Sequence, residues 1–459
     1  MKHLTQEMSD FISRGTDSHI RVAVTGLSRA GKTAFITSLV NQLLHTSTHK
    51  NLPLLASARD GRIIGAKRIP QQNMMIPRFS YDEAMESLNA QPPEWPVPTR
   101  DVSEIRLAIK YKPAKGAKKL LSKNSTLYLD IVDYPGEWLL DLPLLDMDMD
   151  FDTWSQSQFS ALKGDRETYS QQWNAMRGDV DLLAEADEKK LVVIADSYTQ
   201  YLHTCKDNGL HWVQPGRFVL PGELEGAPVL QFFPCIAPEG KFSKTSNYAV
   251  LKARYEEYQQ KVVKAFYKNH FATFDRQIVL VDCLQPLNAG YDSFMDMRGA
   301  LEQLLKSFKY GRSNILRRLF APKIDKILFA ATKADHVTPD QHPNLVSLLQ
   351  QMVHPAWQQA AFEHIDMSCM SIASIQATSA GYISSGSDNV PALQGVTLDN
   401  APQTMYPGEV PRKLPNKQYW ETNQFDFTSF RPMEQHSDEP CQHLRVDKVL
   451  EYLIGDKLK

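Results

Sequence analysis

Short apolar runs and longer helical patterns alternate along this chain. Ala34–Leu44 has apolar residues at helical spacing and predicts a helix, whereas Glu104–Tyr111 alternates apolar and polar residues like a strand with one covered face. Compact apolar runs predict buried strands at Ile20–Val24, Leu127–Val132, Ile278–Cys283 and Ile327–Ala330. Strands separated by helices in this way predict an α/β fold, in which helices flank a mainly parallel sheet.

Long segments interrupt this alternation and predict insertions. Residues 140–275 carry several helical patterns between two expected strands, so we expect a mainly helical insertion there. Residues 46–98 contain Asp60-Gly61, a dipeptide typical of a hairpin turn, and residues 382–444 are rich in proline. The core is then expected to consist of residues 1–45, 99–139 and 276–381, completed by a C-terminal helix in 445–459.

Composition and charge narrow the class of protein. The 459 residues are 42% apolar, enough for a large core, and the formal net charge of −2 does not favour a nucleic-acid partner. We find no apolar run that could span a bilayer and no apolar core of a signal peptide, and the five cysteines form no Cys-x-x-Cys pair. We therefore expect a cytoplasmic protein with reduced thiols.

The segment "GLSRAGKT" (Gly26–Thr33) lies between the first expected strand and the first expected helix. In that setting Gly-x-x-x-x-Gly-Lys-Thr predicts a phosphate-binding loop, although the same pattern alone also fits a simple glycine turn. Backbone N–H groups would surround the phosphates, Lys32 would reach the β- and γ-phosphates, and the Thr33 hydroxyl would bind Mg²⁺. The expected nucleotide contacts are Gly26, Ser28, Arg29, Ala30, Gly31, Lys32, Thr33 and Ala34.

Two further segments predict the rest of a magnesium and phosphate site. Asp133 follows the expected strand 127–132, and ligands of open α/β sheets bind at that end of the strands. We expect Asp133 to bind Mg²⁺ and the N–H of Gly136 to contact the γ-phosphate. Thr99, in a proline-rich stretch before strand 104–111, is the candidate switch threonine for both Mg²⁺ and the γ-phosphate. Taken alone, these segments also fit an ordinary turn and a linker.

Thr332-Lys333-Ala334-Asp335 follows another apolar run and predicts a base-recognition loop. A carboxylate at Asp335 can accept hydrogen bonds from N1 and N2 of guanine, a donor pair that adenine lacks. The aliphatic stem of Lys333 can lie over the base, and Thr332 begins the motif. In Ser371–Ala380 we expect a strand and then a turn, in which the N–H of Ser379 or Ala380 contacts O6 of guanine.

The motifs occur in the order found in Ras-like small GTPases, and "LDIVDYPGE" (Leu129–Glu137) resembles the corresponding Ras segment. Thr332 replaces the usual Asn, and Glu137 replaces the water-positioning Gln. The phosphate loop, "WPVPT" and the C-terminal "RVDKVLEYLIGDKL" also resemble the YcjX-like family of bacterial P-loop GTPases, over nearly the whole chain. That resemblance implies a stress-associated cytoplasmic GTPase, with a membrane protein as partner and a peripheral place at the inner membrane.

Arg29 stands where most Ras-type loops carry a small residue. The loop also resembles that of the guanylate-binding proteins, which use an arginine at the matching position as an internal arginine finger. This implies that Arg29 acts catalytically in cis, after self-association or binding to a partner; a solvent-exposed loop arginine is the alternative. Together with Lys32 and Glu137, it completes the candidate catalytic set.

We therefore expect a GTPase that uses Mg²⁺ to hydrolyse GTP to GDP and phosphate, with nucleotide state transmitted to the insertions beside the switches. Two alternatives stay open. The first is a nucleotide-dependent scaffold that binds GTP or GDP with little turnover. The second is an ATPase. Measurement of hydrolysis with GTP and with ATP distinguishes it from a GTPase.

Overall fold

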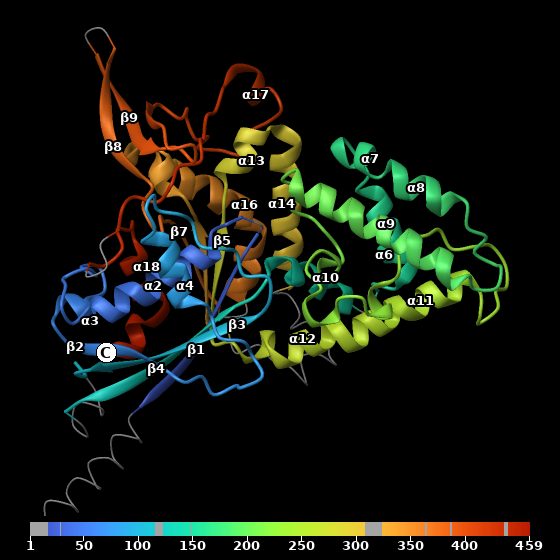
Figure 1. The fold of residues 1–459 in the computed structure, drawn as a ribbon, viewed down its shortest axis with the longest axis horizontal. Helices are drawn as coiled ribbons and strands as arrows, with labels where there is room; N and C mark the ends of the chain where they lie inside the picture. Colours follow the sequence, from blue (N-terminus) through green and yellow to red (C-terminus); the bar gives the residue numbers. More distant parts are fainter. Residues whose placement is uncertain are drawn as a thin grey trace, which may run out of the picture. The chain divides into compact units, whose positions relative to one another are not determined.

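The computed structural model describes residues 17–27, 29–114, 123–146, 148–307, 324–362, 365–385, 388–435 and 439–459. The chain divides into two compact units (Figure 1). The first consists of residues 1–134, 274–288 and 323–459, and the second of residues 135–273 and 289–322.

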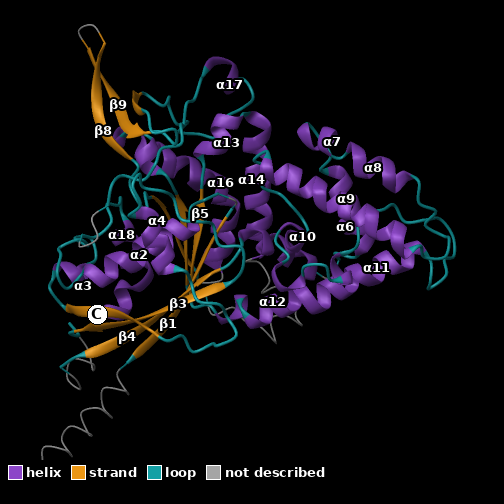
Figure 2. Cartoon of the chain, viewed as in Figure 1, coloured by secondary structure: helices purple, strands orange, loops and turns teal. Residues whose placement is uncertain are grey.

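A seven-stranded sheet of order β2-β3-β4-β1-β5-β6-β7 forms the centre of the first unit (Figure 2). Strands β4, β1, β5, β6 and β7 run parallel, and β3 pairs antiparallel with both β2 and β4. The fold is therefore α/β with a mainly parallel sheet, as the sequence predicts. The strands are β1 (Ser18–Gly26), β2 (Ile63–Ile69), β3 (Ser103–Tyr111), β4 (Ser125–Asp133), β5 (Arg276–Val281), β6 (Lys326–Ala331) and β7 (Asp366–Ser371).

The strand order reverses on either side of β1. β4 lies next to β1 on one side and β5 on the other, with Val24 opposite Asp133 and Gly26 opposite Leu280. In open α/β sheets such a reversal leaves a crevice at the carboxyl ends of the strands, where ligands bind. The loop after β1 opens into this point of the sheet.

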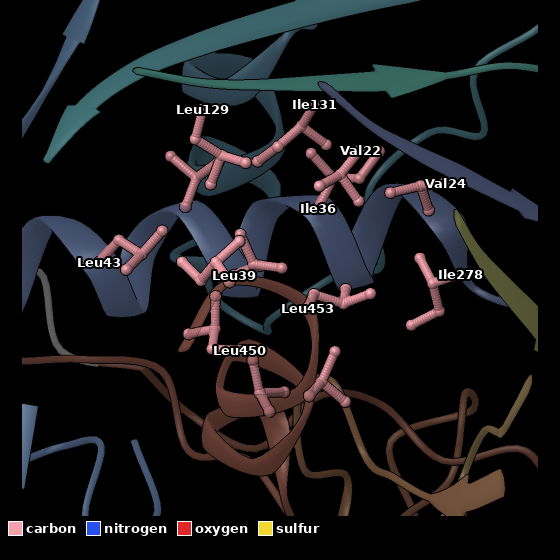
Figure 3. Packing of buried hydrophobic residues seen from close by; sticks show 14 of the residues in the cluster. Val22, Val24, Ile36, Leu39, Leu43, Leu129, Ile131, Ile278, Leu450 and Leu453 are labelled. Atoms are coloured by element: carbon pink, nitrogen blue, oxygen red, sulfur yellow. The ribbon is translucent and has the colours of Figure 1, made fainter. Parts of the chain in front are cut away.

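Helix α2 (Lys32–His45) covers one face of this sheet and is itself covered by α18 (Val446–Ile454). Figure 3 shows Leu39 and Leu43 of α2 between strand residues on one side and Leu450 of α18 on the other. These leucines are at most 3% exposed. Burial of a leucine side chain stabilises a fold by roughly 1.5–3 kcal/mol, so the contact between α2 and α18 contributes substantially to the core.

The remaining elements complete the first unit. A three-stranded antiparallel sheet of order β10-β9-β8 adjoins residue 377, and Figure 1 shows β8 and β9 extending side by side as a hairpin. Its strands are β8 (Thr378–Ser385), β9 (Asp388–Val396) and β10 (Pro402–Met405). The helices are α3 (Ala56–Arg59), α4 (Tyr81–Leu88), α13 (Leu284–Ala289), α16 (His342–Phe362) and α17 (Tyr419–Thr422), with short 3-10 turns at Ala334–His336, Pro339–Gln341 and Gly455–Leu458.

Two local expectations are wrong. Asp60-Gly61 does not join two strands of a hairpin: it ends α3, and β2 then pairs antiparallel with β3 as an edge of the main sheet. Residues 46–98 therefore contribute a strand to that sheet. The strand expected within Ser371–Ala380 ends at Ser371 instead, because Ile372 and Ile375 bury their apolar side chains in a loop.

The second unit consists mainly of helices. Asp187 caps α9 by accepting a hydrogen bond from the Lys190 N–H, and the helix begins at Glu188. Tyr291–Ser307, which lies outside the expected insertion, also belongs to this unit. Its helices are α6 (Phe151–Ser160), α7 (Asp165–Tyr169), α8 (Gln171–Gly178), α9 (Glu188–Asp207), α10 (Gly216–Val219), α11 (Asn247–Glu257), α12 (Lys264–Asn269) and α14 (Tyr291–Ser307).

Aromatic side chains fill the core of the second unit. Trp154 stacks on Tyr255 with ring centroids 5.1 Å apart, and Phe232 meets Trp154 edge to face at 5.3 Å. Such pairs contribute about 0.5–1.5 kcal/mol each beyond the area that they bury. Shorter turns of this unit are η1 (Gly136–Leu145), η2 (Gly222–Leu224), η3 (Pro228–Leu230), the π-helical η4 (Tyr258–Val263) and η5 (Phe271–Thr273). Among the helices in the described ranges, none combines the length and the apolarity that a membrane span requires.

Candidate functional site

The loop between β1 and α2 has the backbone that a phosphate-binding loop requires. A Cβ atom at Gly26 would lie 2.7 Å from the carbonyl oxygen of Leu280, so only glycine lets β1 and β5 approach so closely here. Gly31 has a φ of 80° and Arg29 a φ of 63°, both in the left-handed region. The expected contact at Ser28 lies outside the described residues.

The first turn of α2 can accept an anion. Gly31 provides no side chain to cap the helix, and no acidic residue lies in the first turn. The N–H groups at a helix start need acceptors, and the helix dipole favours negative charge there. Lys32 and Thr33 are partly exposed, while Ala30 and Ala34 are buried beneath them. These features fit a phosphate group.

Thr33 and Thr99 meet although 66 residues separate them in the chain. Their hydroxyl oxygens are 3.3 Å apart, and the N–H of Thr99 donates to the Thr33 hydroxyl at 3.4 Å. Asp133 ends β4 directly beside β1 and is only 1% exposed. Among the described residues there is no group of three or more His, Cys, Asp or Glu side chains suited to a metal ion. A hard cation would therefore rely on hydroxyl, phosphate and water oxygens beside Asp133.

Gly136 and Glu137 begin η1 and belong to the second unit. The carboxylate of Glu137 is 2.8 Å from the ammonium group of Lys206 in α9, and the Glu137 side chain is 6% exposed. The backbone carbonyl of Glu137 also lies so close to Gly216 that a Cβ atom there would meet it at 2.0 Å. Within the second unit, Glu137 is thus packed and paired with a cation.

The segment Thr332–Asp335, which is expected to recognise the base, follows β6 and is hydrogen-bonded to the end of β5 and to Ile372, directly after β7. The N–H of Thr332 donates to Val281 O at 3.0 Å, and the N–H of Ala334 to Ile372 O at 2.9 Å. Asp335 is buried and accepts a hydrogen bond from the N–H of Ala377 at 2.7 Å, with the His336 ring 3.2 Å away. Burial would raise the pKa of Asp335, but His336 and the Ala377 N–H outweigh it and hold the pKa below its usual range.

Lys333 forms an ion pair with a residue that lies outside the sequence motifs. Its ammonium group lies 2.6 Å from the buried carboxylate of Asp282, directly after β5. Asp282 falls within the apolar run Ile278–Cys283 that is expected to form a strand. Its position as an acidic residue at the end of that run is the signal that could have identified it, because ligands bind at the carboxyl ends of parallel strands.

The turn expected at Thr378–Ala380 is not a turn. Ser379 and Ala380 are exposed residues of β8, paired antiparallel with β9. Residues 372–377 make the connection after β7 instead, and Ala377 reaches Asp335. The loop beside the base motif therefore lies earlier in the chain than the sequence pattern suggests.

His342 and Arg445 support the base motif. Arg445 donates to His342 Nδ1 at 2.9 Å, so Nδ1 is the acceptor and Nε2 carries the proton that is donated to Ala334 O at 2.8 Å. Arg445 also donates to Ser371 O at 3.1 Å. Burial, and then the Arg445 cation, lower the pKa of His342. The histidine is therefore held neutral, in one tautomer.

Phe430 joins the base motif to the segment before Thr99. Its ring is 5.7 Å from the ring of His336, and its carbonyl oxygen accepts a hydrogen bond from the Trp95 indole at 2.8 Å. The "WPVPT" segment and the Asp335 loop, more than 200 residues apart in sequence, thus share one contact residue.

Comparison with known proteins identifies the family of this chain. The profile of the YcjX-like family, DUF463, matches residues 20–458. The protein "Ras-like GTPase YcjX" of Escherichia coli (strain K12) is 54% identical over 467 residues, covering 100% of both chains. The protein of the same name from Shewanella oneidensis is 44% identical over 479 residues, covering 99% of this chain and 98% of its own. The chain therefore belongs to the YcjX-like family.

Proposed function

We propose that this protein binds guanine nucleotides and hydrolyses GTP to GDP and phosphate with the help of Mg²⁺. The observation that carries the proposal is the pairing of Thr33 with Thr99 beside an uncapped helix start and a glycine-dependent loop. A Ras-type site needs these two hydroxyls next to each other. The name of the relatives, Ras-like GTPase YcjX, supports the same activity.

The residues take separate parts in this reaction. Loop N–H groups and Lys32 hold the phosphates, while Thr33, Thr99 and Asp133 would hold the metal ion, which neutralises charge on the phosphates. The N–H of Gly136 is the proposed donor to the γ-phosphate. Asp335 is proposed to read guanine, since its buried, ionised carboxylate has lone pairs beyond those used by Ala377 and His336. With Ser379 and Ala380 exposed in β8, residues 372–377 are the better candidates for contact with guanine O6.

Arg29 is the proposed arginine finger. Its side chain is exposed, and among the residues that the structure describes no acidic side chain forms an ion pair with it. A guanidinium can bridge two phosphate oxygens and stabilise charge that develops in the transition state. Activation after self-association or binding to a protein partner is part of this proposal.

A nucleotide-dependent scaffold with little turnover is the second candidate, favoured by one observation. Glu137 stands at the position of the water-positioning Gln and is engaged by Lys206. If Glu137 stays in that pair, the attacking water loses its expected acceptor and hydrolysis is slow. Glu137→Gln should then change turnover with little effect on GTP affinity.

Binding and turnover of the full chain test the proposal directly. We expect GTP and GDP to bind more tightly than ATP, and chelation of Mg²⁺ by EDTA to abolish hydrolysis. Lys32→Ala should lose tight binding, because the phosphates lose their main cation. Unchanged GTP affinity in Lys32→Ala would refute the phosphate loop, and equal affinity for ATP and GTP would refute the guanine assignment.

The cellular setting is proposed from the family resemblance alone. The second unit begins at Pro135, two residues after Asp133. In this proposal the nucleotide state is transmitted to the second unit, which reports it to a membrane-protein partner. We propose a cytoplasmic, stress-associated protein that is peripheral at the inner membrane. Cell fractionation before and after stress, with and without salt washing, tests this placement.

A further inference from the structure

Asp282 makes two distinct sets of contacts with its two carboxylate oxygens. Oδ1 accepts hydrogen bonds from the N–H groups of Leu284 at 3.0 Å and Gln285 at 3.2 Å, at the start of α13. Oδ2 lies 2.6 Å from the Lys333 ammonium group. Burial would raise the pKa of Asp282, but Lys333 and the two N–H groups outweigh it, so the pKa lies below its usual range. The carboxylate is therefore buried and charged.

Lys333 is fixed at both its backbone and its side-chain end. Its φ of 57° places it in the left-handed region, which lysine rarely adopts. Its neighbour Thr332 is hydrogen-bonded to the end of β5, and Ala334 to Ile372, directly after β7. Its ammonium group is held by Asp282, yet 37% of the side chain is exposed. The lysine stem is thus drawn along the sheet edge, from β6 towards β5, with one flank accessible.

This direction matters because of the strand order. β5 lies between β1, which leads into the phosphate loop, and β6, which leads into the base motif. Neighbouring strands are about 4.8 Å apart, so β1 and β6 are separated by roughly 10 Å, a distance that a nucleoside can bridge. A nucleotide with its phosphates on the loop and its base at Asp335 must cross the end of β5, where Asp282 holds Lys333.

We propose that Asp282 is a positioning residue of the nucleotide site, which holds the Lys333 stem as a platform beneath the nucleoside. The inference rests on the proposed function and extends it to a residue outside the recognised motifs. Because the platform meets the face of the nucleoside rather than the edge of the base, it stabilises guanine, hypoxanthine and xanthine nucleotides alike. Asp335, in contrast, reads the edge and discriminates among them.

Asp282→Asn separates the platform from the helix cap. Asparagine keeps an oxygen for the N–H groups of Leu284 and Gln285, but its NH₂ group cannot accept a hydrogen bond from an ammonium group. The α13 contacts survive while the hold on Lys333 is lost. Asp335→Asn is the matched control, since it alters a carboxylate that contacts the base edge rather than Lys333.

The experiment measures equilibrium dissociation constants and dissociation rates of GDP, IDP and XDP for the full chain and its variants. We expect Asp282→Asn to weaken all three nucleotides by the same factor, about tenfold, through faster dissociation. Lys333→Met should weaken them similarly, and the double variant Asp282→Asn/Lys333→Met no further, because both changes remove one interaction. Asp335→Asn should instead shift the preference from GDP towards XDP.

Several results would overturn the inference. The inference fails if Asp282→Asn binds the nucleotides as tightly as the wild type, or if the losses of affinity add up in the double variant. It also fails if the loss differs among GDP, IDP and XDP.

If thermal unfolding of nucleotide-free Asp282→Asn shows a damaged fold, the pair Lys333→Met and Lys333→Arg decides instead. Arginine retains a cation for Asp282 and should recover most of the affinity; equal weakness of both variants refutes the platform. Absence of GDP binding by the wild type refutes the proposed function itself, and is recognised from its own titration.

Discussion

Left-handed backbone angles at residues other than glycine are concentrated around the candidate site. In the described part of the chain such residues are Arg29, Lys333, Asn400 and Arg445, and all but Asn400 belong to the site or contact it. A left-handed residue with a Cβ atom costs about 1–2 kcal/mol, which the surrounding contacts must offset. Strain of this kind is typical of binding and catalytic sites, and here it directs long cationic side chains.

Arg29→Ala tests whether one of these cations acts in the transition state. We expect kcat for GTP hydrolysis to fall at least about tenfold while GDP affinity stays nearly unchanged, because a transition-state contact is absent from the product complex. Arg29→Lys should recover little, since the planar fork is lost. Single-turnover hydrolysis at low and high protein concentration measures both. Wild-type rates under both conditions would leave Arg29 as a loop residue only.

His342 predicts a dependence of stability on pH. Its pKa is lowered in the folded protein, so below about pH 6.5 the unfolded chain takes up a proton more readily than the folded one. The contribution of His342 to the free energy of unfolding is complete above about pH 6.5. It is lost as the pH falls through the pKa of His342 in the folded protein. The charged groups facing the ring are Arg445 and Asp335.

His342→Gln isolates this contribution. Glutamine can accept from Arg445 and donate to Ala334 O, but it does not titrate. We expect the free energy of unfolding of wild type minus variant, from urea titrations between pH 5 and 8, to decrease as the pH is lowered. A difference that does not change with pH would show that His342 is not held neutral.

At the level of elements, the phosphate loop depends on a helix from the other end of the sequence. Leu453 of α18 is 1% exposed and shares a core with α2. We expect Leu453→Ala to lower the free energy of unfolding by about 2–5 kcal/mol, the usual cost of a cavity at a buried leucine. Lys448→Ala, at an exposed position of the same helix, should change it by less than about 0.5 kcal/mol. Equal effects in urea titrations would argue against this packing.

Elements and motifs differ in how far the sequence predicts them. β5 is buried throughout and β1, β4 and β6 are mostly buried, so the short apolar runs of these strands could be recognised in the sequence. The loop Gly26–Thr33 has a local pattern and could be recognised in the same way. The partner of Lys333 could not, because the ion pair with Asp282 joins residues that only the pairing of β5 with β6 brings together. The turn near Ala380 failed for a related reason. Ile372 and Ile375 resemble strand residues, although tertiary packing buries them in a loop.

At the scale of the whole molecule, the second unit has its own buried titrating group. Asp141 accepts hydrogen bonds from Tyr258 OH at 2.5 Å and from Gly216 N–H at 2.9 Å, and burial raises its pKa to about 7 in spite of them. A raised folded pKa means that the stabilising, protonated form is fully present below about pH 4 and is lost as the pH rises towards 7. This dependence is opposite in sign to that of His342.

Asp141→Asn should remove this dependence while keeping an acceptor oxygen. We expect the variant to gain stability relative to the wild type as the pH is raised from 4 to 8, measured as the shift in urea midpoint at each pH. The ionisable groups that interact with Asp141 include Arg217, Tyr258, Tyr198 and Tyr255, and none of these changes charge in this range at its ordinary pKa. A variant that loses stability equally at every pH would indicate a purely geometric role.

The hydrogen bond from Ala377 to Asp335 also constrains the thermodynamics of the molecule. Ala377 immediately precedes β8, so the carboxylate proposed to read guanine is bonded to the base of the projecting hairpin. A partner that binds the hairpin more tightly when this hydrogen bond is formed, or when it is broken, must change the affinity of the protein for guanine nucleotides. By reciprocity, the nucleotide changes the affinity of that partner by the same factor, whichever binds first. Measurement of one coupling therefore determines the other.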